Sequence, residues 1–578
     1  MKRIFFGHRG VGKTELLKRH QSYFPDVDHY DLDQEIANHA AQSVSEFFAN
    51  HGEAEFRKLE AQIFNKIIQK GSFVIAVGGG FDVSTIPSIF ERIYVSRRTD
   101  KDGRIFLYRP RLNPEMDSLE EYQYRYRQRE PAFLEFSDWV YEMSEGITAS
   151  DIENEVFKEE TSSSESYVTL QPDHLKLLEK FKSIELRTDI FSNEEILEFL
   201  KRNNRFMVSI RNEKGKSLLP LIKDRCLVDW ALEHGVPSEA ELTLTSVVST
   251  HNESLAAALQ ELEPYKFHHL KLCPIVKTWE ELQIGYEWQK KESNLRSFLP
   301  RTDPLYGESS VWRWFREYML PFQKLNFISQ YSKIQDQPCY FETLLRLSQD
   351  QSLFSAVIGW PIEHSRTPGV HNGYFNHSTL AIPLDEMNFE IATKFLISLG
   401  LKTTAVTSPL KNLASDSTGV MGCNSISFFK DWIGRNTDIL AIDTICQDYL
   451  STSDQVAVWG GGGVIERMRD DYPQFLYFSS REGTLRSHSE SSAERNIETS
   501  PTVVIWAAPR TPATKMPPPQ WTPRLVIDFN YVESSMGLEY TLGLKNKVNY
   551  VSGLEFFRLQ AAEQIKFFKQ NLERAKPS

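Results

Sequence analysis

The chain has 578 residues, too many for one hydrophobic core, so its length predicts three or four domains. Hydrophobic residues make up 40% and charged residues 25%, which excludes a wholly disordered chain. A formal charge of −12 argues against broad nucleic-acid binding, and no apolar run approaches a membrane-spanning length. The apolar run at 4–6 is too short for a signal core, and five scattered cysteines fit a reducing cytoplasm. We therefore expect cytoplasmic small-molecule chemistry.

Two changes in composition divide the chain. Residues 151–166 are acidic and then serine-rich, which predicts a linker. The polar run at 348–352 separates a helical pattern from an apolar strand pattern at 354–358. We expect one domain over 1–150, a linker over 151–166, a second domain over 167–349 and a third over 353–578.

A strand, a glycine-rich loop and a helix open the chain. Apolar residues at 3–6 precede GHRGVGKT at 7–14, and a helical pattern follows. In this context the glycines let backbone N–H groups surround phosphate, the lysine neutralises phosphate charge and the threonine hydroxyl ligates magnesium. A plain connecting turn is the alternative, which the Lys-Thr pair disfavours. The expected nucleotide-binding residues are Gly7, Gly10, Gly12, Lys13 and Thr14.

Later motifs of the first domain resemble shikimate kinase. They are Asp31-Leu32-Asp33, then Gly52-Glu53 with Phe56-Arg57, and the glycines at 78–80. The resemblance implies ATP and Mg²⁺ as cofactors, with Asp31 organising the metal and with Lys13 and Asp33 as catalytic residues. Turn capping by the aspartates and a solvated basic face for the later arginines are the alternatives. The resemblance further implies a lid role beside ATP for Arg109 and substrate contacts from Asp33, Arg57, Gly78, Gly79, Gly80 and Arg129.

Eight short apolar runs form the second domain, with helix-like segments between most of them. This alternation predicts a (β/α)8 barrel with its chemistry at the carboxyl ends of the strands. The expected strands are 167–170, 184–189, 206–210, 227–232, 242–248, 269–273, 295–299 and 325–329.

The second domain also resembles type I 3-dehydroquinate dehydratase. The motifs are residues 185–189, 249–252 and Lys271-Leu272. A lysine in a buried strand is costly without a partner or a task, and a partly neutral amine forms a Schiff base with a ketone. The resemblance implies that Lys271 is this amine and His251 the acid–base group; a solvated lysine and an ordinary loop histidine are the alternative. The implied substrate-pocket residues are Glu185, Arg187, Arg211, Arg313 and Gln337.

Two positions depart from that family. Ala231 stands where the family usually has an acid that pairs with the catalytic histidine. The usual glycine-rich approach to the late arginine is replaced by SSVWR at 309–313. A slow barrel, or one decayed to a scaffold, therefore stays open.

The third domain opens with VIGWPIEHSRTP at 357–368, followed by His371-Asn372. These motifs resemble the start of shikimate dehydrogenase, which implies that Ser365 and Thr367 offer hydroxyls to a substrate carboxylate. Residues 406–411 and 434–438 resemble the loops that carry the catalytic Lys411 and Asp438. An ammonium held by a carboxylate supplies a proton to oxygen as hydride reaches carbon, whereas a surface ion pair is the alternative. The resemblance adds Asn424, Asp438 and Gln560 as substrate contacts.

A dinucleotide-binding pattern lies within this third domain. An apolar strand at 456–459 enters four glycines and then a helical run. The next strand, 475–478, is followed by Ser-Ser-Arg without an acid for a ribose hydroxyl, so Arg481 favours NADPH. Ile465 and Trp506 are larger than the family's usual residues. We expect a substrate part over 353–450, an NADP part over 451–550 and a returning C-terminal helix, with cofactor contacts from Gly460, Gly461, Gly462, Gly463 and Arg481.

The whole pattern predicts an α/β multidomain chain: a P-loop α/β/α sandwich, a (β/α)8 barrel and a two-part dehydrogenase with a Rossmann domain. Their order resembles the last three domains of the fungal pentafunctional aromatic-biosynthesis polypeptide. Because the same set resembles a fungal quinate-pathway repressor, a non-catalytic metabolite sensor stays open, as does an active kinase with decayed domains. The expected partners are 3-dehydroquinate, 3-dehydroshikimate and shikimate, with neither nucleic acid nor membrane; a homodimer also stays open.

Overall fold

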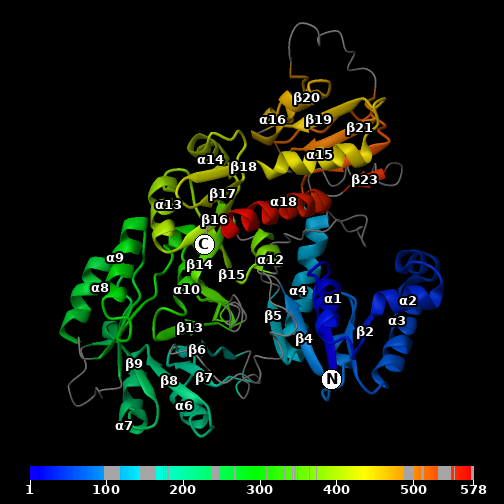
Figure 1. Ribbon diagram of the computed structural model, residues 1–578. Helices are drawn as coiled ribbons and strands as arrows, with labels where there is room; N and C mark the ends of the chain where they lie inside the picture. Colours follow the sequence, from blue (N-terminus) through cyan, green and yellow to red (C-terminus); the bar gives the residue numbers. More distant parts are fainter. Residues whose placement is uncertain are drawn as a thin grey trace. The chain divides into compact units, whose positions relative to one another are not determined.

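In the computed structural model, the described residues form four β-sheets (Figure 1). One compact unit holds the first two sheets, and a second unit holds most of the other two. None of the described helices is long and apolar enough to cross a bilayer. The structure describes residues 1–578 except 97–117, 143–164, 173–174, 176–177, 179–180, 236–245, 266–267, 308, 330–333, 341–342, 344–345, 348, 363–364, 373, 462, 487–499, 509–512, 531–548, 552 and 575–578.

The first sheet is parallel, with strand order β2-β3-β1-β4-β5. In its central strand β1 (Lys2–Phe6), Ile4 and Phe6 pack on one face of the sheet and Phe5 on the other. The loop between β1 and α1 (Lys13–Tyr23) therefore lies at the carboxyl edge of the sheet, as the P-loop pattern requires. The other elements are β2 (Asp28–Asp31), α2 (Leu32–Ala40), α3 (Val44–Ile68), β3 (Phe73–Ala76), η1 (Val83–Thr85), β4 (Glu91–Ser96), α4 (Ser118–Phe136) and β5 (Trp139–Glu142).

Eight parallel strands form a nearly closed barrel, in the order β12-β11-β10-β9-β8-β7-β6-β13 (Figure 1). Each predicted apolar run overlaps one of these strands, so the barrel prediction is confirmed. Residues 242–245 of the fifth predicted run lie outside the described part of the chain. The strands are β6 (Glu165–Thr169), β7 (Ser183–Arg187), β8 (Arg205–Ile210), β9 (Leu227–Ala231), β10 (Val247–Thr250), β11 (His269–Leu272), β12 (Arg296–Phe298) and β13 (Leu325–Ile328).

Helices and short 3₁₀ turns connect the barrel strands. Serine side chains cap several of them: Ser192 accepts from the Glu195 N–H at the start of α6, and Ser254 from the Ala257 N–H at α8. The connecting elements are α6 (Asn193–Phe199), η4 (Glu213–Leu218), α7 (Leu219–Ile222), η5 (Leu232–His234), α8 (Leu255–Leu262), η6 (Glu263–Tyr265), α9 (Trp279–Lys290), η7 (Pro304–Tyr306) and α10 (Arg313–Met319).

The third sheet has the order β15-β14-β16-β17-β18, and its last two strands pair antiparallel. Strand β14 begins at Asp350, four residues before the predicted apolar run at 354. The sequence pattern missed this start because residues 350–352 are polar and alternate between exposed and partly buried positions. The elements are β14 (Asp350–Gly359), α12 (Thr367–Asn372), β15 (His377–Pro383), α13 (Phe389–Ser398), β16 (Leu401–Val406), α14 (Lys411–Thr418), β17 (Ser425–Phe428), β18 (Trp432–Arg435) and α15 (Thr437–Tyr449).

The fourth sheet is parallel, with order β20-β19-β21-β22-β23, and confirms the Rossmann-type prediction. One face packs against α15 and α16 through Ile442 and Met468. The opposite face carries an aromatic cluster of Trp459, Trp506 and Trp521. The elements are β19 (Val456–Gly460), α16 (Gly463–Asp471), β20 (Leu476–Phe478), β21 (Val503–Ala507), β22 (Leu525–Asp528), β23 (Asn549–Val551) and α18 (Gly553–Arg574).

Three buried histidines predict that the chain loses stability in acid. Burial lowers the pKa of His20 to about 3 and those of His269 and His377 to about 4. An unfolded histidine titrates near about 6.5, so below that pH the unfolded state binds more protons than the folded state. Their stabilisation is complete above about pH 6.5 and is lost as the pH falls toward 4, by roughly 1–3 kcal/mol per histidine. Urea unfolding across this range measures the effect.

Replacing His20 tests this prediction, because its contacts require a neutral ring. Its Nε2 faces Arg3 at 2.9 Å and its Nδ1 faces His29 at 2.7 Å, while His29 Nδ1 donates to the Val27 carbonyl. Only neutral rings satisfy this chain of donors and acceptors. His20→Gln should reduce the acid slope, and His39→Gln, at an exposed position of α2, should not; equal slopes for both variants and the wild type would refute the explanation.

Candidate active sites

The first site is the glycine loop between β1 and α1. Gly7, Gly10 and Gly12 all have positive φ, which L side chains rarely adopt. The Lys13 ammonium donates to the carbonyls of Gly7 and His8, at 2.9 Å each, and so lies against its own loop. This cradle with a cation on it fits the phosphates of a nucleotide.

A hydroxyl and a carboxylate meet beside this loop. Thr14 Oγ1 donates to Asp31 Oδ2 at 2.6 Å. The other Asp31 oxygen accepts from the N–H groups of Asp33 and Gln34 at the start of α2. The capping role and the proposed metal role of Asp31 are therefore compatible, and the oxygen pair suits a hard cation such as Mg²⁺.

The acceptor side of the site gathers around Gly78. A Cβ at Gly78 would lie 2.9 Å from Asp33 Oδ1 and 3.6 Å from Glu60 Oε1, so both carboxylates face this glycine. Arg57 Nη1 donates to Glu60 Oε2 at 2.6 Å. Burial raises the pKa of Glu60, and Arg57 opposes that shift. Sequence reasoning missed Glu60, which sits one helical turn beyond Arg57 and fixes its guanidinium.

The structure places three more of the residues predicted for the first site. A Cβ at Gly79 would collide with the backbone of Arg9, so this position is close to the glycine loop. Gly80 continues the same turn, and Arg129 is half-buried on α4. Arg109 lies outside the described residues.

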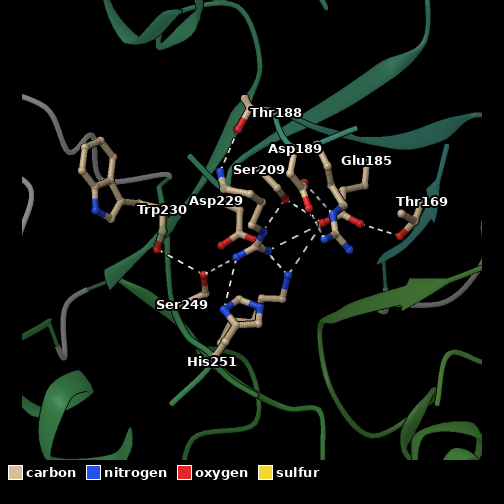
Figure 2. A network of polar contacts seen from close by, with 12 residues as sticks. Thr169, Glu185, Thr188, Asp189, Ser209, Asp229, Trp230, Ser249 and His251 are labelled. Atoms are coloured by element: carbon tan, nitrogen blue, oxygen red, sulfur yellow. Dashed lines mark hydrogen bonds and ion pairs between the residues drawn. The ribbon is translucent and has the colours of Figure 1, made fainter. Parts of the chain in front are cut away.

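The second site is a polar network inside the barrel (Figure 2). Ser209 Oγ contacts Glu185 Oε1 at 2.6 Å and Asp229 Oδ2 at 3.0 Å, and Thr169 Oγ1 donates to Glu185 Oε2. The Trp230 ring points away from this network because side chains alternate along β9. Glu185 of β7, which was predicted, thus shares one interior with Asp229 of β9, which was not.

Lys271 is buried in this network among carboxylates. Its Nζ lies 2.7 Å from Asp229 Oδ2, 3.8 Å from Glu185 Oε1 and 3.4 Å from the centre of the Phe327 ring. Lys271 does not end its strand in solvent; its side chain is 4% exposed. The alternative of a solvated lysine is therefore wrong.

Arg211 completes the charge balance. Its Nη2 lies 2.6 Å from Asp229 Oδ2 and 3.8 Å from Glu185 Oε1. Burial raises the pKa of Asp229, but Arg211 and Lys271 outweigh it and hold the pKa below its usual range. Glu185 shows the same balance, with burial opposed chiefly by Lys271. The barrel interior thus holds Glu185 and Asp229 in contact with Arg211 and Lys271.

His251 lies at the edge of this network and has an acid partner. Glu233 Oε1 accepts from the His251 backbone N–H, and Oε2 lies 3.6 Å from Nδ1. Burial and Arg211 lower the pKa of His251 to about 4, while Glu233 opposes the shift. Glu233 of η5 thus places a carboxylate beside the His251 ring, whereas Ala231 at the end of β9 has none to offer.

The remaining predicted barrel residues are placed as follows. Arg187 pairs with Asp189, with Nη2 2.6 Å from Oδ2. Gln337 Nε2 donates to Thr169 Oγ1 at 3.1 Å and so reaches the network. Arg313 is buried at the start of α10.

The third site lies at the carboxyl side of the third sheet. Lys411 Nζ is 2.5 Å from Asp438 Oδ2, with the lysine side chain 25% exposed and the aspartate 8%. The structure therefore brings together the two residues that the sequence proposed as a pair. A mostly buried carboxylate with a partly accessible ammonium is unlike the surface ion pair of the alternative.

An amide cluster adjoins this pair. Asn424 Oδ1 accepts from the backbone N–H of Thr437 at 2.9 Å, and Gln560 Nε2 donates to the Thr437 hydroxyl at 2.9 Å. Helix α18 therefore contacts the end of the third sheet and the start of α15. Ser365 Oγ accepts from the Thr367 N–H at 3.3 Å near the start of α12.

A glycine turn between β19 and α16 forms the fourth feature. Gly460 has φ +143, and a Cβ there would lie 2.6 Å from the Ala507 backbone. A Cβ at Gly461 would collide with the guanidinium of Arg486, which therefore lies against the turn. Arg486 was not predicted, because it follows a hairpin-like return after β20. Arg481 is exposed, Gly463 begins α16, and Gly462 lies outside the described residues.

Two large residues near the turn are accommodated by packing. Trp506 is fully buried in the aromatic cluster, and its Nε1 donates to the Ala508 carbonyl at 3.0 Å. Ile465 packs on the other face with Met468. Both side chains are thus part of the core of the fourth sheet.

Residues 9–161 match the family model of shikimate kinase. The shikimate kinase match includes Lys13 and Thr14 of the loop and Asp31, Asp33, Arg57 and Glu60 around the acceptor side. A shikimate kinase of Rhizobium meliloti (strain 1021) is 35% identical over 118 residues, 20% of this chain and 55% of the relative. A shikimate kinase of Lactococcus lactis subsp. lactis (strain IL1403) is 39% identical over 80 residues, 14% of this chain and 46% of the relative. The chain spans about half the length of the curated relatives it matches.

Two solved structures also match parts of this chain. The dehydroquinate dehydratase and shikimate dehydrogenase of S. pombe AroM covers 73% of this chain and 99% of its own, with 15% identity and a TM-score of 0.27. A shikimate dehydrogenase in complex with NADP+ covers 40% of this chain and 99% of its own, with 16% identity and a TM-score of 0.32.

Proposed function

We propose that the chain is a multifunctional shikimate-pathway enzyme. It dehydrates 3-dehydroquinate to 3-dehydroshikimate, reduces that ketone with NADPH to shikimate, and phosphorylates shikimate with ATP. The kinase family match over 9–161 carries the proposal, since it supports shikimate as the substrate of one site. The buried Lys271 and the Lys411–Asp438 pair supply the groups that the other two reactions need.

In the kinase site, ATP would supply the phosphoryl group, with Mg²⁺ neutralising its phosphates. Gly7, Gly10, Gly12 and Lys13 would hold the phosphates, and the Thr14–Asp31 pair would hold the metal. Asp33 accepts the proton of the attacking shikimate hydroxyl. Arg57, fixed by Glu60, grips the shikimate carboxylate, and the turn at 78–80 lines the same site.

In the barrel, the Lys271 amine attacks the ketone carbon of 3-dehydroquinate, and loss of water leaves a C=N bond. His251 then removes a proton from the neighbouring carbon, and that electron pair shifts toward the iminium nitrogen. The pair returns to expel the β-hydroxyl, which leaves as water with the proton from His251. Hydrolysis of the C=N bond releases the product and the free amine.

The ion pairs of Lys271 determine which group can take its proton. Lys271 must lose a proton before it attacks, and Asp229, at 2.7 Å, is the nearest base. Its pKa is held low by Arg211 together with Lys271. When the substrate binds Arg211, the guanidinium stabilises the Asp229 carboxylate less. The pKa of Asp229 then rises, and Asp229 accepts the Lys271 proton more readily. Glu185, Arg187, Arg313 and Gln337 bind the remaining substrate groups.

In the reductase site, NADPH would supply hydride to the ketone carbon. Lys411, held by Asp438, gives a proton to the ketone oxygen. The Asp438 carboxylate then passes a new proton from water to Lys411. Ser365 and Thr367 bind the substrate carboxylate, while Asn424 and Gln560 bind ring hydroxyls. Gly460, Gly461, Gly462, Gly463 and Arg481 would hold the dinucleotide.

Separate assays test the three activities. Each substrate is supplied alone with its cofactor, and product is followed by mass spectrometry. Three positive assays support the proposal. If one activity is missing, the function proposed for that domain is wrong.

Arg486 should also contribute to the dinucleotide site. Its guanidinium lies against Gly461, where a dinucleotide places its phosphates, and a charge-assisted hydrogen bond contributes about 1.5–3 kcal/mol. Arg486→Ala should therefore raise the KM for NADPH about 10–100-fold with little change in kcat. Steady-state reductase assays give both constants; Arg467→Ala on α16, which pairs with Asp471, is the control. An unchanged KM would exclude Arg486 from the cofactor site.

A further inference from the structure

Glu233 and Arg211 compete for one nitrogen of His251. Arg211 Nη1 lies 3.3 Å from His251 Nδ1, and Glu233 Oε2 lies 3.6 Å from the same atom. A guanidinium only donates hydrogen bonds, so Nδ1 beside Arg211 must be unprotonated. A carboxylate only accepts them, so Nδ1 beside Glu233 must carry the proton. The two neighbours therefore select opposite tautomers.

The backbone around His251 is fixed on both sides. Its N–H donates to Glu233, and its carbonyl accepts from Arg301 Nη2. Thr250, the preceding residue, donates to Glu261 Oε2 at 2.5 Å and lies 3.2 Å from Glu233 Oε1. Because the main chain is held, the Cα of His251 stays beside both partners, and a change of partner at Nδ1 requires a change of tautomer.

We propose that Glu233 is the positioning acid of the barrel: it holds Nδ1–H of His251, so that Nε2 is the base that removes the substrate proton. Substrate binding draws Arg211 away from Nδ1, and Glu233 becomes its partner. This inference rests on the proposed dehydratase function. It assigns the role to an acid in η5, two residues beyond Ala231, and not to the position that the resembled family uses.

The charged groups around His251 give the proposal a pH signature. They are Arg211 after β8, Lys271 on β11, Glu233 in η5 and Arg301 after β12. Burial, Arg211 and Lys271 lower the pKa of the ring, and Glu233 raises it. Removing the Glu233 charge therefore lowers the pKa of His251 and moves the acid limb of the kcat profile to lower pH.

The test uses the full-length protein and 3-dehydroquinate. Glu233→Gln should lower kcat for dehydration about 10–100-fold, leave KM within about threefold and shift the acid limb to lower pH. Glu233→Asp, which keeps the charge, should recover part of kcat. Glu213→Gln is the matched control, because Glu213 is an exposed acid that pairs with Lys216.

Borohydride trapping distinguishes the role of Glu233 from the proposed dehydratase function on which it rests. Wild type and Glu233→Gln should both give a reduced adduct at Lys271 by mass spectrometry, because imine formation does not need the base. No adduct and no turnover in the wild type would overturn the dehydratase function itself. Normal adduct with wild-type kcat and pH profile in Glu233→Gln would overturn only the role of Glu233. If Glu233→Gln does not fold, a Glu233→Asp variant with unchanged kcat and acid limb would overturn it as well.

Discussion

Replacing Lys271 by Ala is expected to abolish dehydration of 3-dehydroquinate, by at least about 10³-fold in kcat/KM, and to spare the other two activities. The amine is the only group that we assign to the covalent step, so no neighbour can replace it. Product formation with 3-dehydroquinate alone measures the loss. Normal dehydration by this variant would contradict the Schiff-base mechanism.

The variant also has a predicted structural cost. Lys271 neutralises Asp229 and Glu185 inside the barrel, and removing one partner of a buried ion pair costs about 3–5 kcal/mol. The kinase and reductase assays on the same sample report whether the chain remains folded. Lys277→Ala, at a 62% exposed position after β11, is the matched control and should leave all three activities unchanged.

Replacing Lys13 by Ala is expected to lower phosphorylation of shikimate about 10²–10³-fold, with dehydration and reduction unchanged. The ammonium lies on the glycine loop and would neutralise charge that develops on the transferred phosphoryl group. ATP-dependent formation of shikimate 3-phosphate measures it.

The control for Lys13 lies on the same helix. Lys18→Ala removes an exposed lysine of α1 and should retain full kinase activity. A Lys13→Ala variant that also lost reductase activity would show that the domains are not independent. A Lys13→Ala variant with full kinase activity would show that the glycine loop does not bind the phosphates.

Much of the fold could be predicted because its signals are local in sequence. The eight barrel strands appear as apolar runs, and the glycine loop appears between a strand and a helix. Lys411 and Asp438 also carry local motifs, and the structure brings them within 2.5 Å. Such signals need no knowledge of which segments meet in space.

The missed residues share the opposite property. Glu233 reaches His251 from a 3₁₀ turn after another strand, so the sequence around Ala231 suggested that the histidine lacked an acid. Arg486 reaches Gly461 only after the chain returns from β20. Glu60 lies in a long helix where a glutamate is ordinary, and only its burial beside Arg57 distinguishes it. Each depends on tertiary contacts that periodicity and motif spacing do not encode.

The most direct test of three linked activities is a single reaction. The purified full-length chain is incubated with 3-dehydroquinate, NADPH, ATP and magnesium, and every pathway product is followed by mass spectrometry. We expect shikimate 3-phosphate to form from 3-dehydroquinate. Absence of every product, even when each intermediate is supplied separately and still binds, would contradict the enzyme function and favour a metabolite sensor.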